Sequence, residues 1–101
     1  MRLVVALVRP AQVEDVRQAL SNADIVRLSI CDAQAIETEG GPAVVSQQAV
    51  IEVAVNDDFL DRAVDCIAAV LRVEDLSARL WVVPIDQAVQ IYRDVRGPEA
   101  I

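Results

Sequence analysis

The sequence contains no histidine, and all nine of its basic residues are arginine, so lysine is absent as well. Histidine is the usual general base and a common metal ligand near neutral pH, and lysine is the usual amine nucleophile. Aromatic residues make up only 3 % of the chain, with one tryptophan, one tyrosine and one phenylalanine. These absences make an enzyme the least favoured class of function.

Positive charge is also scarce, because nine arginines face sixteen acidic residues and the formal net charge is −7. Nucleic acids and anionic membranes are bound through basic faces, so we expect neither as a partner. The two cysteines, Cys31 and Cys66, form no C-x-x-C pair. The chain shows no signal peptide and no membrane-spanning stretch. We therefore expect reduced thiols in a cytoplasmic protein, without direct membrane insertion.

Apolar residues are plentiful, at 54 % of 101 residues, with a mean hydropathy of +0.37. This length predicts one small domain over residues 1–101. A core of this size is marginal by itself, so we expect part of the apolar surface to be buried against another chain.

The first half of the chain predicts two strands and a helix. Residues 2–8 are apolar on both faces, as in a strand covered on both sides. A helix is expected over 12–21, with Val13, Val16 and Leu20 facing inward. Residues 25–33 alternate as a second strand, and 37–46 form a loose loop.

The second half repeats the strand–helix–strand order. Residues 49–55 alternate as a strand, and Asn56 is expected to cap a helix that reaches residue 71. Its apolar stripe consists of Leu60, Ala63, Val64, Ile67, Ala68 and Leu71. A doubly apolar strand at 80–83 ends at Pro84, before a helical turn at 86–89 and a polar tail at 92–101. Trp81 and Phe59 are expected in the core.

This order predicts an α+β, ferredoxin-like βαββαβ fold, with two helices on one face of a four-stranded antiparallel sheet. Two helices cover only one face, yet two strands are apolar on both. The second face must also be dry, and a closed oligomer whose sheets face each other is the economical solution.

Four segments resemble the PII nitrogen-regulatory signalling proteins: ALVRPAQVEDVRQAL (6–20), VIEVAVNDDFLDRAVDCI (50–67), WVVPIDQAVQI (81–91) and RGPEAI (96–101). The resemblance covers nearly the whole chain. It implies a homotrimer that is not an enzyme and binds adenine nucleotides in clefts between subunits. It also implies a protein target, such as a transporter or an enzyme, that is contacted through a T-loop.

The T-loop is much shorter here than in the family, and is reduced to about residues 37–46. The family's Gly-Phe-Gly-Arg-Gln run is replaced by Ala-Ile-Glu-Thr-Glu at 35–39, so the glutamine that helps to hold magnesium and 2-oxoglutarate is missing. Two interpretations stay open for Gly40 and Gly41. They form a shortened hairpin connection, or a small loop that becomes ordered when an anion approaches its backbone.

The family's glycine-rich phosphate loop is rewritten at about residues 72–79, where no glycine remains. Only its cation survives, as Arg79. The family's two C-terminal phosphate-binding arginines fall on Gln90 and Tyr92, although Arg93 and Arg96 lie close by. Tyr92 either stacks on a base or fills an apolar gap.

The end of the cleft that holds the base is better preserved. Leu7 and Ala54 match the family's apolar walls, and Ser29 keeps a hydroxyl at the position of a threonine that contacts the base. Glu52 matches a cleft glutamate. A carboxylate in mid-strand either binds a ligand or pairs with an arginine (Arg9, Arg27 or Arg79) across the trimer interface.

The resemblance therefore implies a regulator that senses ADP or AMP rather than ATP, with no covalent cofactor. Some short-T-loop relatives serve carboxysome or bicarbonate-transport functions, so a bicarbonate-like anion is a plausible co-ligand. The alternative is a trimer without a nucleotide, acting as a structural or partner-binding module. No metal site is expected, because helix-end electrostatics and pairing with Arg62 account for the acids of the second helix (Asp57, Asp58, Asp61 and Asp65).

Overall fold

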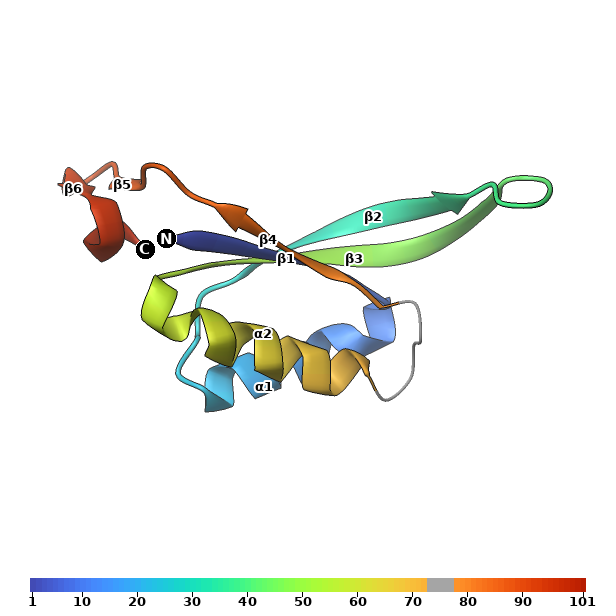
Figure 1. Cartoon of the computed structure of the whole chain (residues 1–101), viewed down its shortest axis with the longest axis horizontal. Coiled ribbons are helices and arrows are strands. Elements are labelled where there is room, and N and C mark those ends of the chain that lie inside the picture. Colours follow the sequence, from blue (N-terminus) through green and yellow to red (C-terminus); the bar gives the residue numbers. More distant parts are fainter. Residues whose placement is uncertain (73–77) are drawn as a thin grey trace.

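The computed structural model describes residues 1–72 and 78–101. Its main elements are β1 (Arg2–Val8), α1 (Val13–Asn22), β2 (Ser29–Glu37), β3 (Val44–Val55), α2 (Asp57–Leu71) and β4 (Leu80–Pro84). The four strands form an antiparallel sheet in the order β2-β3-β1-β4, and both helices cover one face of it (Figure 1). The predicted βαββαβ fold is confirmed.

The core lies between the helices and this covered face. The predicted inner residues Val16 and Leu20 of α1 are buried, as are Ala63, Ile67 and Leu71 of α2. They pack against every second residue of β1 and β3, namely Val4, Ala6, Val8, Ala49, Ile51, Val53 and Val55. The period-2 and period-3.6 patterns thus point to the same core.

The second strand begins later than predicted, at Ser29 instead of residue 25. At the end of α1 the backbone N–H groups of Ala23 and Ile25 both donate to the carbonyl of Leu20, at 3.0 and 2.9 Å. Asp24 takes a left-handed conformation with φ 64°. The buried Ile25 side chain therefore closes the helix end instead of entering the sheet.

The C-terminal segment also differs from the prediction of a helical turn at 86–89 and a polar tail. It contains β5 (Val89–Gln90), β6 (Val95–Arg96) and the 3₁₀ helix η2 (Gly97–Ala100), and another 3₁₀ turn, η1 (Pro10–Gln12), precedes α1. The Ile85 N–H donates to the Met1 carbonyl at 3.0 Å, so the chain stays extended beyond Pro84. The Gly97 N–H then donates to the Ala88 carbonyl at 2.9 Å, which fixes the small β5–β6 hairpin.

The other face of the sheet, which we call the open face, is not covered by any element of the described chain (Figure 1). The strand register places Leu3, Val5 and Leu7 of β1 on this face, opposite Ala54, Glu52 and Val50 of β3. Trp81 pairs with Val5 and is 51 % exposed, so its predicted place in the core is wrong for a single chain. Phe59, by contrast, packs against the core.

The β2–β3 hairpin extends beyond the rest of the sheet and gives the molecule its length of 50 Å (Figure 1). β1 pairs with β3 only up to Ala49, so residues 33–48 form a two-stranded projection that we call the arm. Within the expected loop of residues 37–46, Glu37 ends β2 and residues 44–46 already belong to β3. Residues 38–43 connect β2 and β3, and both interpretations of this connection stay open.

Within residues 1–72 and 78–101, no helix is both long and apolar enough to cross a bilayer. In the same ranges no three acidic or cysteine side chains gather closely enough to hold a metal ion. Asp57 instead accepts a 3.1 Å hydrogen bond from the N-terminal ammonium group. Arg62 does not pair with these acids as predicted: it lies over the Phe59 ring, 4.7 Å from the ring centre, and its Nη1 donates to the Ala23 carbonyl.

Candidate functional site

A groove with a volume of about 760 Å³ lies at the end of the sheet opposite the arm. One wall comes from the sheet and the α1–β2 connection, with Leu3, Leu28 and Ala54. The other wall comes from the C-terminal segment, with Ile85, Ala88 and Ile101. An apolar concavity that carries a few polar groups is the usual form of a small-molecule site.

Three of the predicted site residues, Ser29, Glu52 and Ala54, line this groove together. Ser29 pairs directly with Glu52 across β2 and β3, so its hydroxyl and the Glu52 carboxylate share the open face. The Glu52 side chain is exposed, and in the described part of the chain it has neither a hydrogen bond nor an ion pair. The predicted pairing of Glu52 with an arginine involves a second subunit across the trimer interface, so it stays a prediction.

The charges of the groove are mostly negative. Among the described lining residues Arg27 is the only cation, and it is accompanied by the carboxylates of Asp24 and Glu52. A triphosphate needs several cations or converging backbone N–H groups. This part of a single chain offers a hydroxyl, a carboxylate and apolar walls, which suit a base or a sugar better than a chain of phosphates.

The remaining predicted residues lie outside the groove lining. Leu7 lies on the open face opposite Val50, two residue pairs nearer the arm than Glu52. Arg79 immediately precedes β4, whose first residue, Leu80, pairs with Ala6, so it too lies toward the arm.

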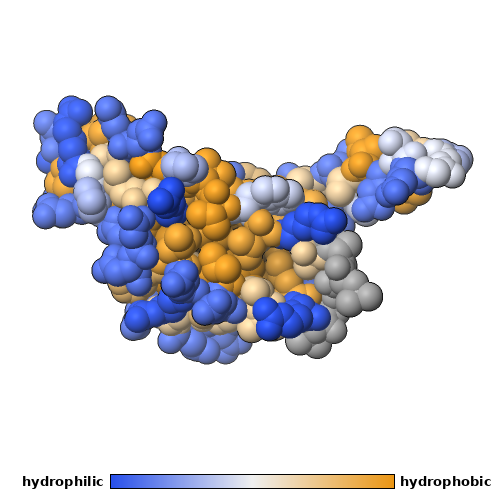
Figure 2. All heavy atoms as spheres, in the orientation of Figure 1, coloured by the Kyte–Doolittle hydropathy of each residue, from blue (hydrophilic) through white to orange (hydrophobic). Residues whose placement is uncertain are grey.

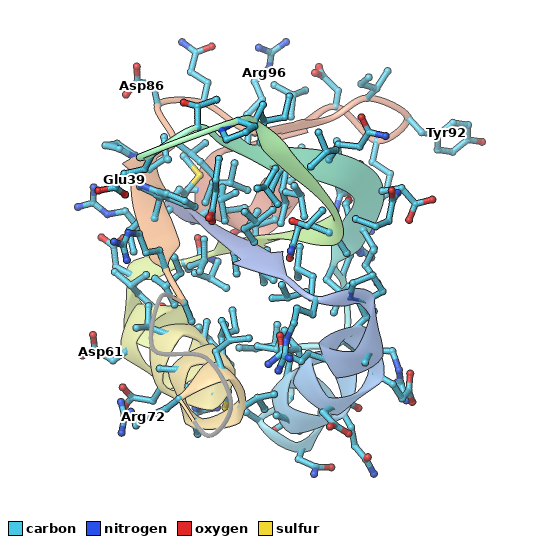
Figure 3. All side chains as sticks on the ribbon, turned by 90° about the vertical axis from the view of Figure 1, so that its right-hand side faces the viewer. Glu39, Asp61, Arg72, Asp86, Tyr92 and Arg96 are labelled. Atoms are coloured by element: carbon cyan, nitrogen blue, oxygen red, sulfur yellow. The ribbon has the colours of Figure 1, made fainter. Side chains whose placement is uncertain are left out.

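The C-terminal arginines lie on the β5–β6 hairpin, beside the groove. Arg93 is in the turn between the two strands, and Arg96 ends β6, where its Nη2 lies 3.2 Å from Asp94 Oδ1. Figure 3 shows Arg96 and Tyr92 pointing outward from the body of the molecule. Tyr92 is fully exposed, so within one chain it fills no apolar gap.

The two loop glycines lie at the tip of the arm, far from the groove (Figure 1). Gly40 has φ +73°, a backbone conformation that other residues rarely adopt, and open space surrounds it. Gly41 does not have a positive φ. Residues 73–77, most of the predicted altered phosphate loop 72–79, lie outside the described residues.

The C-terminal wall of the groove was not predicted, although the apolar residues after Pro84 were a usable signal. Asn56 helps to hold this wall in place. It occupies the predicted cap position of α2, but its side chain makes no capping hydrogen bond. Its Nδ2 group instead donates to the Pro98 carbonyl at 2.9 Å, which fastens the C-terminal segment to the start of α2.

Known proteins resemble this chain along almost all of its length. The model of the family described as "Nitrogen regulatory protein P-II" matches residues 1–95. The chain belongs to the P-II family. It is similar to nitrogen regulatory protein GlnK1 of Methanosarcina mazei, with 26 % identity over all of this chain and 97 % of the relative. It is also similar to the P-II proteins of Nostoc punctiforme (28 % identity) and Rhizobium etli (29 % identity), each covered over 100 % of both chains.

The alignment with GlnK1 extends over 114 positions, whereas this P-II protein has 101 residues. The chain therefore lacks residues that the relative possesses. A connection of only six residues, 38–43, between β2 and β3 agrees with a shortened loop in this P-II protein.

Proposed function

We propose that this P-II protein is a non-enzymatic cytoplasmic regulator that binds ADP or AMP, in preference to ATP, in clefts between the subunits of a homotrimer. The observation that carries the proposal is the groove that brings together Ser29, Glu52 and Ala54. Glu52 is a carboxylate in mid-strand that has no partner among the described residues of its own chain. A ribose hydroxyl or an amino group is a suitable donor for it.

The distribution of the site residues supports a cleft between subunits. One set, Ser29, Glu52 and Ala54, lines the groove, and a second set, Leu7 and Arg79, lies nearer the arm. The groove itself does not include the second set. A neighbouring copy that packs on the open face would bring the second set of one subunit toward the first set of the next.

The trimer itself is supported by the open face. Leu3, Val5 and Leu7 lie there, next to Trp81, which is half exposed. Contiguous apolar surface of this kind usually marks an interface. Closed rotational symmetry would cover it in every subunit at once.

The preference for fewer phosphates follows from the scarcity of cations. Arg27 is the one cation among the described residues that line the groove, and the sequence of residues 72–79 contains no glycine. Each charge-assisted phosphate contact is worth about 1.5–3 kcal/mol, so each lost contact weakens the affinity for ATP about ten- to hundredfold. A small anion such as bicarbonate is proposed as a co-ligand beside Arg79.

The same scarcity favours one alternative. The described lining of the groove carries two acidic side chains and one cation. The same charges would suit a P-II trimer that no longer binds a nucleotide and acts only through a protein partner. The two functions differ in one measurable property, the binding of an adenine nucleotide.

Calorimetric titration of the purified protein with ATP, ADP and AMP, each with and without bicarbonate, tests the proposal. We expect ADP or AMP to bind more tightly than ATP. Glu52→Gln should remove binding while the oligomer stays intact, whereas Glu37→Gln, the same change on the arm, should leave it unaltered. Arg79→Ala should weaken binding, with Arg17→Ala, an exposed arginine of α1 outside the predicted site, as its control. No heat from any nucleotide would instead support the ligand-free alternative.

A further inference from the structure

The arm leaves one edge of β3 without a neighbouring strand. β3 spans Val44–Val55, but β1 pairs with it only between Ala49 and Val55. Val44–Gln48 therefore pairs with β2 on one side alone. On the other side no strand of the described chain lies against these five residues. This free edge is a notch in the sheet, about 17 Å long at the usual rise of a strand and bounded by the end of β1 at Val8.

The notch has none of the features that normally protect a free edge. Proteins shield such edges with lysine, proline or inward-facing charges, or keep the strand short. Residues 40–51 contain no charged side chain, and Pro42 lies outside the strand, in the turn. Val44 and Val45 are 63 % and 56 % exposed, and Ile36, which pairs with Val45, is 63 % exposed. These residues offer backbone groups and apolar contacts to an added strand.

The charge of the region indicates which strand would fit. No basic residue occurs in the sequence between Arg27 and Arg62. The arm carries the exposed carboxylates of Glu37 and Glu39, and Asp32 lies at its base. Glu39 lies in the connection between β2 and β3, at the tip of the arm, and Figure 3 labels it. A segment with arginine or lysine beside apolar residues would satisfy both the carboxylates and the exposed valines.

A second sheet edge, that of β4, is less suitable for such a segment. Figure 2 shows apolar surface in the middle of the view, where β4 and α2 lie in Figure 1, and the exposed Trp81, Val82 and Val83 belong to β4. This strand, however, ends at Pro84, which has no backbone N–H to donate to an added strand. The notch is the better complement.

We propose that the free edge of β3 at Val44–Gln48 receives an extended basic segment of a protein partner, which adds to the sheet as a further strand. Main-chain hydrogen bonds to the edge supply the affinity, and pairing with the arm carboxylates selects the basic segment. The proposal concerns a different surface from the nucleotide groove. It therefore holds whether or not a nucleotide binds.

A short peptide of alternating arginine and valine is the probe, titrated into the full chain and followed by NMR amide hydrogen exchange. We expect the amides of residues 44–48 to become protected when the peptide binds. The matched control peptide has the same sequence with alternate backbone nitrogens methylated, which keeps its charge but removes its ladder hydrogen bonds. This control peptide should not bind.

Four results would overturn the proposal: absence of binding, equal binding of the methylated peptide, protection at β2 or β4 instead, or an edge already protected in the free protein by a second copy.

A pair of variants tests the charge separately. The double variant Glu37→Gln/Glu39→Gln should weaken binding by up to about fivefold for each carboxylate at low salt. Asp61→Asn/Asp65→Asn makes the same charge change on exposed positions of α2 and should leave binding unaltered. Equal weakening by both variants would mean that net charge alone attracts the peptide.

Discussion

The two faces of the sheet carry similar side chains but have different surroundings. On the covered face Val4, Ala6 and Ile51 are completely buried beneath α1 and α2. On the open face Leu3, Val5 and Leu7 occupy the alternate positions of the same strand and are only half buried. The difference lies in what packs on each face, and not in the hydrophobicity of the strands.

Within its own chain, β1 is therefore fully buried on one face only. Strands that are apolar on both faces are normally covered on both. The helices cover one face, and the second face has no cover within the described chain (Figure 1). The covered face should therefore determine whether the subunit folds, and the open face should determine whether subunits assemble.

The largest effect is expected on the covered face. Ile51→Ala removes a completely buried side chain beneath the helices, so it should lower the free energy of unfolding by about 2–5 kcal/mol. Chemical denaturation at one fixed protein concentration measures this change, since the stability of an oligomer depends on concentration.

Ile36→Ala is the matched control for that change. Ile36 follows the same alternation along β2 but lies on the arm, where it is exposed. Its replacement should change stability by less than about 0.5 kcal/mol. Equal losses at the two positions would contradict the division between a covered body and a bare arm.

The next effect is expected on the open face. Val5→Glu places a carboxylate in the middle of that face, beside Trp81 and Glu52. The subunit should keep its circular dichroism spectrum, but the oligomer should dissociate, because each buried charge costs several kcal/mol. Light scattering measures the mass. Trp81 is the single tryptophan, so a red shift of its emission reports the exposure of this face.

Val44→Glu is the control for Val5→Glu. Val44 belongs to β3 and faces the same side of the sheet, but it lies on the arm and is already well exposed. This variant should leave both the mass and the tryptophan emission unchanged. A wild-type protein that is a monomer at all concentrations would refute the functional contrast between the two faces altogether.

The sequence predicted the fold well where apolar periodicity was long. The stripe of α2 and the alternation of β3 are confirmed, and both helices lie on one face. The prediction from the sequence was wrong where a local hydrogen bond, and not the apolar pattern, determined the structure. Residues 25–28 alternate as a strand would, yet Ile25 closes the end of α1 through its hydrogen bond to Leu20. The alternation of a few residues cannot reveal that contact.

The candidate site was predictable only in part. Ser29, Glu52 and Ala54 were named from the sequence, and they do lie together in the groove. The C-terminal wall and the Asn56–Pro98 hydrogen bond were missed, because they join positions 42 residues apart through one side-chain amide. Which residues of a second subunit meet Glu52 depends on the packing of the open faces, and that packing follows from surface shape rather than from periodicity.

The smallest effect is expected at the rim of the covered face, where Asp57 links the start of α2 to the start of β1. Its Oδ1 atom lies 3.1 Å from the N-terminal nitrogen and 3.6 Å from Arg2 Nε. The hydrogen bond from the N-terminal ammonium group, and then the charge of that group, hold the pKa of the Asp57 carboxyl below its usual value. Its side chain is 71 % exposed, so water and salt weaken the attraction.

Because this pKa is lowered in the folded state, the contribution to stability is complete above the unfolded value of about 3.9 and is lost as the pH falls through the folded pKa. Asp57→Asn should therefore lower the midpoint of thermal unfolding slightly at pH 6, and the difference from wild type should vanish in strong acid.

Asp58→Asn is the control. It removes a charge from the same helical turn without the contact to the N-terminus, so it should lower the midpoint of thermal unfolding less than Asp57→Asn does. Equal losses at the two positions would mean that the helix end, rather than the link to β1, is what Asp57 stabilises. The rim contact would then play no part in holding the helices over the covered face, and apolar packing alone would distinguish that face from the open one.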